Sequence, residues 1–468
     1  MIFTEARFIE FFVLVFALHW ALPKNEQRKV LLLAASYVFY AAWDWRFLSL
    51  IIISGLVDFV VGIRLFETDD ESRRRHWLYV SLFANLGMLG FFKYFNFFVD
   101  SGGDFLRLIG LPMSRSNLEI ILPVGISFFT FQTMSYSIDI YRRRLEPSRS
   151  LLDVMLFVGF FPQLVAGPIV RAAHFIPQLS ASRVLADIKA RPYLTLFLVG
   201  FIKKACISDN LAPLVDQYFA TPMEFTAMSA WIATLLYAVQ IYCDFSGYTD
   251  MAIGCAGLLG YDIGVNFDFP YYAADIRDFW RRWHMSLSTW LRDYLYISLG
   301  GSHGTKLFVY RNVLITMLLG GLWHGAAWNF VIWGGLHGAA LIVHREWRER
   351  GFGSRLPLPV WRLGAPLLTM WWVLLAWIFF RAEGLGDALR IVRAFVLFDA
   401  PGARELSPVL FLVFAGLAVV HGLNRRQRAT EWAQDLSPWA FWPVYGATIA
   451  VALGFVRPVV EPFIYFQF

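Results

Sequence analysis

One histidine stands inside a long apolar stretch of the chain. His324 lies within the sequence GGLWHGAAWN, residues 320–329. An ionisable side chain in a membrane-spanning segment is costly to bury, so it marks a candidate functional site. Burial favours the neutral imidazole, the form that accepts a proton from a hydroxyl group. The glycines on both sides would let a substrate approach the ring. We therefore predict that His324 is a catalytic general base. The alternative is a structural histidine that hydrogen-bonds to a neighbouring helix.

A second histidine lies among cations, tryptophans and hydroxyl groups. His284 belongs to the sequence WRRWHMSLS, residues 280–288. One interpretation is that His284 orients a substrate or polarises its carbonyl, while Arg281 and Arg282 face phosphate groups. The other is an interfacial helix whose Trp and Arg side chains anchor it to lipid headgroups. The chain has no Gly-x-Ser-x-Gly pattern, so we do not expect a Ser–His–Asp hydrolase.

Further polar side chains are scattered through the apolar runs. At such depth a polar group either lines a cavity or joins two helices. We expect Gln132, Asp244 and Asn329, together with Trp323 beside the histidine, to line the substrate path. The 3 cysteines show no metal-ligand spacing and are expected to pack as small apolar side chains. We therefore predict neither a metal site nor a bound cofactor.

Composition indicates the kind of element that positions these residues. The chain has 468 residues, of which 58% are hydrophobic and 16% charged, whereas about 25% are charged in an ordinary soluble domain. Long apolar runs alternate with short charged clusters, which is typical of helices that cross a lipid bilayer. The net charge of +6 comes from Lys and Arg beside these runs. Such residues orient a membrane protein, so we do not expect nucleic-acid binding.

The pattern predicts an all-α polytopic membrane protein with a single domain over residues 1–468. We expect about 11 crossings plus re-entrant or interfacial helices, because several runs are shorter than the roughly 20 residues of a perpendicular span. Residues 275–296 have the spacing of one amphipathic helix. The candidate spans are residues 8–22, 30–43, 47–66, 77–99, 120–140, 151–172, 193–207, 228–243, 250–262, 309–345 (two helices), 365–381, 389–399, 408–423 and 438–456.

Basic clusters predict the orientation of the chain. Clusters at 24–29, 73–75 and 142–144 follow the first, third and fifth candidate spans, so they lie on one side. The positive-inside rule makes that side cytoplasmic and places the N-terminus outside. Arg425, Arg426 and Arg428 precede the last span, so the aromatic tail 457–468 is also expected outside. By itself this tail could be an interfacial aromatic belt.

Several blocks of sequence together resemble the membrane-bound O-acyltransferase family, in particular its bacterial alginate O-acetyltransferase type. The resemblance is clearest between residues 120 and 340, and the N-terminal third and the tail look similar too. The blocks are LPVGISFFTFQ at 122–132, SYSIDIYR at 135–142, FFPQLVAGPI at 160–169, DFWRRWH at 278–284 and GLWHG at 321–325.

The resemblance implies a ring of tilted helices around a central funnel in the bacterial inner membrane, surrounded by membrane lipid. His324 matches the family's essential histidine, and His284 matches a second one that is commonly retained. Acetyl-CoA would be the cytoplasmic donor substrate. The acyl group would reach a separate periplasmic partner of the acetylesterase-like (SGNH) kind, which modifies the polymer. Tyr465 fits the C-terminal tyrosine through which related systems are thought to relay the acyl group.

Other functions stay open at this point. A D-alanyl transferase for another envelope polymer is the nearest alternative, and the polymer could be alginate, cellulose, peptidoglycan or another exopolysaccharide. A membrane transporter would also have buried polar groups. However, transporters often contain two matching halves, and the sequence shows none. An inactive scaffold is disfavoured because both histidines are present.

Overall fold

The computed structural model describes the whole chain except residues 112–119, 166, 353–357, 427, 459–460 and 465–468. Within the described residues the prediction of an all-helical chain is confirmed, since the only β pairing there is a single bridge between Phe225 and Arg404. The chain forms two compact units. The first contains Met1–Lys189 and Cys255–Gly264, and the second contains Ala190–Gly254 and Val265–Phe468. The prediction of a single domain stays a prediction.

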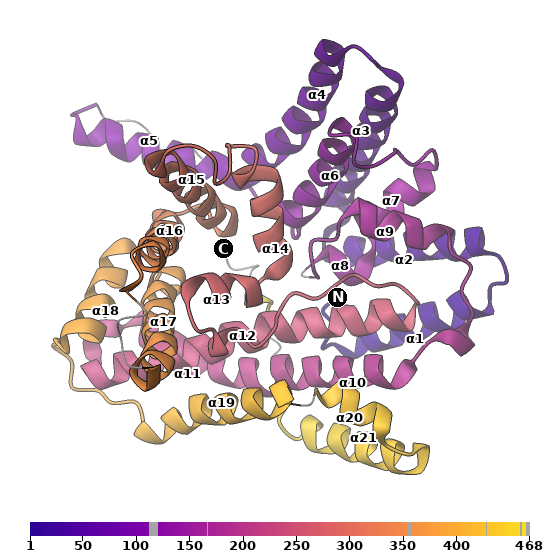
Figure 1. Ribbon diagram of the computed structural model, residues 1–468. Helices are drawn as coiled ribbons and strands as arrows, with labels where there is room; N and C mark the ends of the chain where they lie inside the picture. Colours follow the sequence, from indigo (N-terminus) through magenta and orange to yellow (C-terminus); the bar gives the residue numbers. More distant parts are fainter. Residues whose placement is uncertain (112–119, 166, 353–357, 427, 459–460, 465–468) are drawn as a thin grey trace. The chain divides into compact units, whose positions relative to one another are not determined.

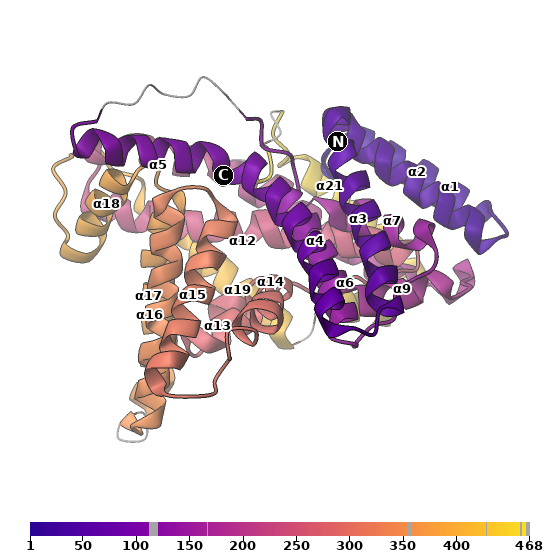
Figure 2. The ribbon, with the colours of Figure 1, turned by 90° about the horizontal axis from the view of Figure 1, so that it is seen from above.

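The first unit is built around a buried carboxylate. Helices α3, α4 and α6 lie side by side (Figures 1 and 2). Asp58 of α3 is 1% exposed and accepts hydrogen bonds from Ser81 (2.5 Å) and Asn85 (2.8 Å) of α4 and from Ser137 of α6. The helices are α1 (Ala6–Ala21), α2 (Asn25–Asp44), η1 (Trp45–Phe47), α3 (Leu48–Glu67), α4 (Glu71–Leu89), η2 (Gly90–Tyr94), α5 (Phe95–Leu108), α6 (Ile126–Tyr141), α7 (Leu151–Gly159), α8 (Phe161–Leu164), α9 (Ala172–Ser180) and η3 (Leu185–Asp187).

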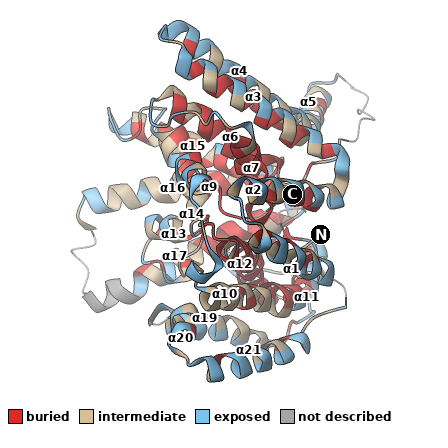
Figure 3. Cartoon of the chain, turned by 90° about the vertical axis from the view of Figure 1, so that its right-hand side faces the viewer, coloured by how far each residue is buried: buried red, intermediate tan, exposed pale blue. Residues whose placement is uncertain are grey.

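The second unit packs its helices around α12, most of which is apolar and buried on every side (Figure 3). Its helices are α10 (Ala190–Phe201), η4 (Ile202–Ser208), α11 (Asp209–Ala220), η5 (Pro222–Glu224), α12 (Ala227–Leu258), η6 (Pro270–Tyr272), α13 (Ile276–Arg282), α14 (Met285–Trp290), η7 (Leu291–Tyr296), α15 (Lys306–His324), α16 (Trp328–Glu349), α17 (Leu358–Arg381), α18 (Leu385–Leu397), η9 (Pro408–Leu410), α19 (Phe411–Arg426), α20 (Ala429–Asp435) and α21 (Pro438–Leu453). The last turn of α12 belongs to the first unit.

Five helical stretches of the described residues are long and apolar enough to cross a membrane, by length and composition. They are Asn25–Glu67, Glu71–Leu108, Lys306–His324, Gly364–Arg381 and Pro408–Arg425. Large apolar side chains such as Phe83 on α4 and Leu412 on α19 are exposed, as expected of surfaces that face lipid. The predicted number of about 11 crossings stays a prediction.

The amphipathic segment 275–296 differs from its prediction. It is divided into α13 and α14, with α14 continuing directly into η7, because the chain breaks at His284, whose φ is +42°. The next two backbone N–H groups do not bond within a helix: that of Met285 donates to the backbone oxygen of Asn266 (2.9 Å), and that of Ser286 donates to its side-chain oxygen (3.1 Å). Asn266, which precedes His284 by 18 residues, therefore caps α14 and separates it from α13.

Removing the Asp58 carboxylate should destabilise the first unit. In Asp58→Ala three buried donors lose their acceptor, at a cost of about 2 kcal/mol or more. The midpoint of thermal unfolding, followed by tryptophan fluorescence in detergent, should drop by several degrees. Asp104→Ala is the control, because Asp104 is exposed and, among the described residues, its ion pair is with Arg107. Equal midpoints for the two variants would contradict this role of Asp58.

Candidate active site

His324 is the last residue of α15 and is 3% exposed. Its ring meets three aromatic rings nearly edge-on, with centroid distances of 5.0 Å to Trp323, 5.0 Å to Trp333 and 5.3 Å to Phe380. The chain turns extended at Gly325 and resumes as α16 at Trp328, so the imidazole stands at a helix end. An aromatic enclosure of this kind keeps water from the ring and leaves its nitrogens to the substrate or to protein groups.

The glycines around His324 serve a purpose other than the one predicted. A Cβ at Gly321 would lie 2.1 Å from the backbone oxygen of Phe330, and one at Gly334 would lie 2.2 Å from that of Met317. A Cβ at Gly325 would lie 2.1 Å from the Phe330 ring. Protein atoms fill the space beside Gly321 and Gly325, so for these two glycines the prediction that they clear a path for substrate is wrong. Gly321 and Gly334 let α15 and α16 pack backbone against backbone.

His284 is fully buried, and its environment fixes its tautomer. Its Nδ1 lies 3.1 Å from Oδ1 of Asn266. The same Asn266 atom accepts the backbone N–H of Ser286, which can only donate, so the atom is the amide oxygen. An oxygen without a proton cannot donate to the ring. In the neutral imidazole Nδ1 therefore carries the proton, and Nε2 has the lone pair.

The structure brings the two predicted catalytic histidines together. Their ring centroids are 6.2 Å apart, one at the end of α15 and the other between α13 and α14. Trp323 lies against both, at 5.9 Å from the His284 ring and 5.0 Å from the His324 ring. Phe245 of α12 covers His284 from another side, at 4.7 Å. Two buried imidazoles thus belong to one cluster of packed aromatic rings in the second unit, the histidine cluster.

The predicted arginines differ in their surroundings. Arg282 donates to Asp278 (2.9 Å) and lies 3.4 Å from the Asp268 carboxylate, so protein groups already hold its guanidinium. Arg281 is exposed, and within the described residues no ion pair involves it. Of the two, Arg281 is the better placed to meet a phosphate group.

The other predicted lining residues mostly bind the protein's own backbone. Asn329 donates to the oxygen of Ala382 (2.8 Å), which joins the start of α16 to the end of α17. Gln132 lies in the first unit and donates to the backbone oxygen of Phe157. Asp244 pairs with Lys204 at 2.5 Å. Tyr465 lies outside the described residues. Whether any of these residues lines a substrate path stays a prediction.

Two functional candidates escaped the sequence analysis. Asn266 stands between apolar residues, and this amide in an apolar context was the only local signal that could have drawn attention to it. Lys204 is a cation inside a predicted span, which the rule for intramembrane charges could have identified. Both bind partners that are distant in the sequence.

Comparison with known proteins decides the family. Residues 113–381 match the model of the membrane-bound O-acyltransferase family, MBOAT. The chain belongs to the MBOAT family. Both histidines lie within the matched residues. The resemblance noted in the sequence is therefore confirmed: this MBOAT chain is an O-acyltransferase and a multi-pass membrane protein.

Individual relatives extend the match over most of the MBOAT chain. A probable alginate O-acetylase AlgI of Azotobacter vinelandii is 42% identical over 400 residues, which cover 85% of this chain and 78% of the relative. A peptidoglycan O-acetyltransferase of Helicobacter pylori is 38% identical, over 86% of this chain and 80% of the relative. A teichoic acid D-alanyltransferase of Streptococcus thermophilus is 29% identical over 51% of this chain and 60% of the relative.

Asn266 should matter for activity through His284. Asn266→Ala removes the acceptor that holds the ring, so O-acyl transfer per molecule should fall about tenfold or more, the equivalent of one lost buried hydrogen bond. Asn266→Asp retains an acceptor at the same place, so this variant should keep most of the O-acyl transfer activity.

The control for this pair is Asn312→Ala. Asn312 is equally buried but donates to the backbone oxygen of Gly301, away from both histidines. Its loss should lower stability and leave transfer per folded molecule nearly unchanged. Equal activity losses in the two alanine variants would rule out a specific role for Asn266.

Proposed function

We propose that this protein moves acetyl groups from cytoplasmic acetyl-CoA across the bacterial inner membrane for O-acetylation of an exopolysaccharide, with alginate as the first candidate. A periplasmic acetylesterase-like (SGNH) partner would complete the transfer. The observation that carries the proposal is the pair of buried histidines, 6.2 Å apart, in one cluster of aromatic rings. Such surroundings suit an acyl transfer that must exclude water, because water would hydrolyse the activated donor.

The relatives favour acetyl over D-alanyl transfer. The proteins named as alginate or peptidoglycan O-acetylating enzymes are 38% to 42% identical in the two examples above and match more than three quarters of their own length. The similarity to the D-alanyltransferase is weaker and covers about half of the chain. The names differ in their polymer, which supports the view that the acceptor is chosen outside the shared membrane core.

The proposal includes an arrangement in the membrane. About 11 crossings would surround a funnel that opens to the cytoplasm, with both termini periplasmic. The basic clusters that follow the first, third and fifth predicted spans support this orientation. The donor would then enter from one face of the membrane and the acceptor hydroxyl from the other.

The chemical step needs one base. As the acceptor oxygen attacks the thioester carbonyl carbon, its proton passes to the neutral imidazole of His324. The C–S bond then breaks, the CoA thiolate takes up that proton, and an oxygen ester remains. The Nε2 of neutral His284 accepts hydrogen bonds and does not donate them. This tautomer suits a ring that orients a hydroxyl group and argues against one that polarises the carbonyl.

Replacing His324 should abolish acetylation. General-base help contributes roughly 10²- to 10⁴-fold, so His324→Ala should lower the acetate content of the polymer to background. The measurement is alkali-released acetate from purified polymer, with the amount of variant protein in the membrane as control. Full acetylation by a normally abundant variant would refute the base assignment.

The tail hydroxyl gives a second test. We propose that Tyr465 receives the acetyl group before the periplasmic partner does. Tyr465→Phe removes only one oxygen, so it should block transfer while leaving the amount of protein in the membrane unchanged. Polymer acetate is again the measurement, and Phe466→Tyr is the control, since it adds a hydroxyl to the same tail. Unchanged acetylation in Tyr465→Phe would reduce the tail to an anchor.

A further inference from the structure

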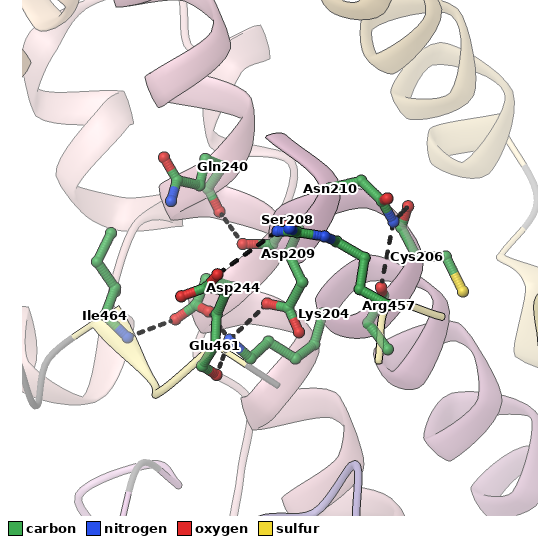
Figure 4. A network of polar contacts seen from close by, with 11 residues as sticks. Lys204, Cys206, Ser208, Asp209, Asn210, Gln240, Asp244, Arg457, Glu461 and Ile464 are labelled. Atoms are coloured by element: carbon green, nitrogen blue, oxygen red, sulfur yellow. Dashed lines mark hydrogen bonds and ion pairs between the residues drawn. The ribbon is translucent and has the colours of Figure 1, made fainter. Parts of the chain in front are cut away.

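A deeply buried charge cluster of the second unit lies outside the histidine cluster. Lys204 of η4 is 1% exposed at its side chain and pairs with Asp209 of α11 at 2.8 Å and Asp244 of α12 at 2.5 Å (Figure 4). Taking three charges out of water is unfavourable unless each is paired and hydrogen-bonded. The acyl transfer proposed above uses none of the three, so their burial needs another explanation.

The C-terminal segment completes this cluster. Lys204 also donates to the backbone oxygen of Glu461 at 3.1 Å, beside its hydrogen bond to Asp244 and its ion pair with Asp209. The second carboxylate oxygen of Asp244 accepts the backbone N–H of Ile464 at 3.0 Å. Both members of the ion pair thus extend their bonding onto the same four-residue stretch, 461–464 (Figure 4).

The bonds continue upstream along the tail. The Cys206 thiol contacts the oxygen of Ala452 (3.3 Å), and Asn210 donates to that of Phe455 (2.8 Å). Arg457 donates to the backbone oxygen of Asp209 (3.0 Å). Residues 204–210, which include part of the π-helix η4, therefore contact four positions after the middle of α21, namely Ala452, Phe455, Arg457 and Glu461. π-Helical turns are frequent at functional sites.

The C-terminal segment 461–464 lies close to the histidine cluster. The Phe463 ring is buried and lies 4.9 Å from the Tyr248 ring and 5.6 Å from the Phe245 ring. Phe245 in turn meets His284 edge-on at 4.7 Å. A single aromatic ring thus separates the tail from His284, and Tyr465 follows two residues after Phe463 in the sequence.

We propose that Lys204 and Asp244 are positioning residues that clamp the C-terminal segment so that the chain's last residues are delivered to the histidine pair. The inference rests on the proposed function, in which Tyr465 accepts the acetyl group. A clamp would raise the effective concentration of the tail hydroxyl at the histidine pair, because it restricts where the end of the chain can go. The clamp acts through backbone atoms of the tail and through the buried Phe463 ring.

A neighbouring pair on the same elements provides the matched control. Lys203 and Asp250 also join η4 to α12, with an N–O distance of 2.6 Å and side chains about one fifth exposed. Among the contacts of the described residues this pair makes none with the tail. Lys203→Met and Lys204→Met therefore remove the same charge from adjacent positions, and only the second removes a bond to the C-terminal segment.

The experiment compares the two variants in the full-length protein in detergent, with two measurements. Hydrogen–deuterium exchange of the C-terminal peptide should be at least about tenfold faster in Lys204→Met, as expected for loss of a charged hydrogen bond. Polymer acetate should fall by a similar factor. Lys203→Met should change either quantity by less than about twofold. Lys204→Arg, which keeps the positive charge and its N–H donors, should restore the slow exchange and the acetylation.

Two further variants apply if Lys204→Met does not accumulate. Ile464→Pro removes the N–H that binds Asp244 and leaves every charge of the cluster paired. Ile464→Ala shortens the same side chain and keeps the N–H. The clamp predicts faster tail exchange and less acetylation in the proline variant than in the alanine variant.

The outcomes separate this inference from the function on which it rests. Normal tail protection in Lys204→Met overturns the clamp, as do equal losses in Lys203→Met and Lys204→Met. A loosened tail with unchanged acetylation overturns its role in delivery. Failure of the proposed function would instead appear as full acetylation by His324→Ala, whatever the exchange rate of the tail.

Discussion

The position of His324 depends on the direct backbone contact between α15 and α16. Gly321 and Gly334 have no room for a Cβ, so the two helices meet without side chains between them. This contact brings the end of α15 against Trp333 of α16, and Phe380 of α17 covers another side of the imidazole. Electrostatic interactions strengthen where water is excluded. The surroundings of the His324 ring therefore depend on Gly321 and Gly334, two residues without side chains.

Three buried polar side chains of the second unit have one feature in common. Each forms a hydrogen bond with the backbone of a segment that is distant in the sequence. Asn266 caps the helix that follows His284, Asn329 holds the end of α17, and Lys204 holds the C-terminal stretch. Each bond satisfies a polar group that would otherwise be buried alone, and it also joins segments that the helices by themselves would not order. Because the acceptors and donors are backbone atoms, the joined segments can change sequence without losing these bonds.

Sequence predicted many of the helices and singled out both histidines because both produce local signals. The run 47–66 is α3 within a residue or two, and His324 and His284 stand out as imidazoles in apolar surroundings. The break at His284 was missed, because it depends on Asn266, 18 residues away. Lys204 was missed as an anchor because Glu461 is 257 residues distant. The glycines were misinterpreted because a sequence shows that a side chain is missing and not which atoms fill the space.

The tight contact between α15 and α16 has a consequence for how the protein is made. A connection of three residues, 325–327, joins the two helices, and their glycine contacts run antiparallel, so they form a helical hairpin. His324 and Asn329 flank its tip. A single helix that carried either polar group into lipid would have to desolvate it alone. As a paired hairpin the two helices can enter the bilayer together and shield these groups from lipid during insertion, before α17 and the helices after it have been synthesised.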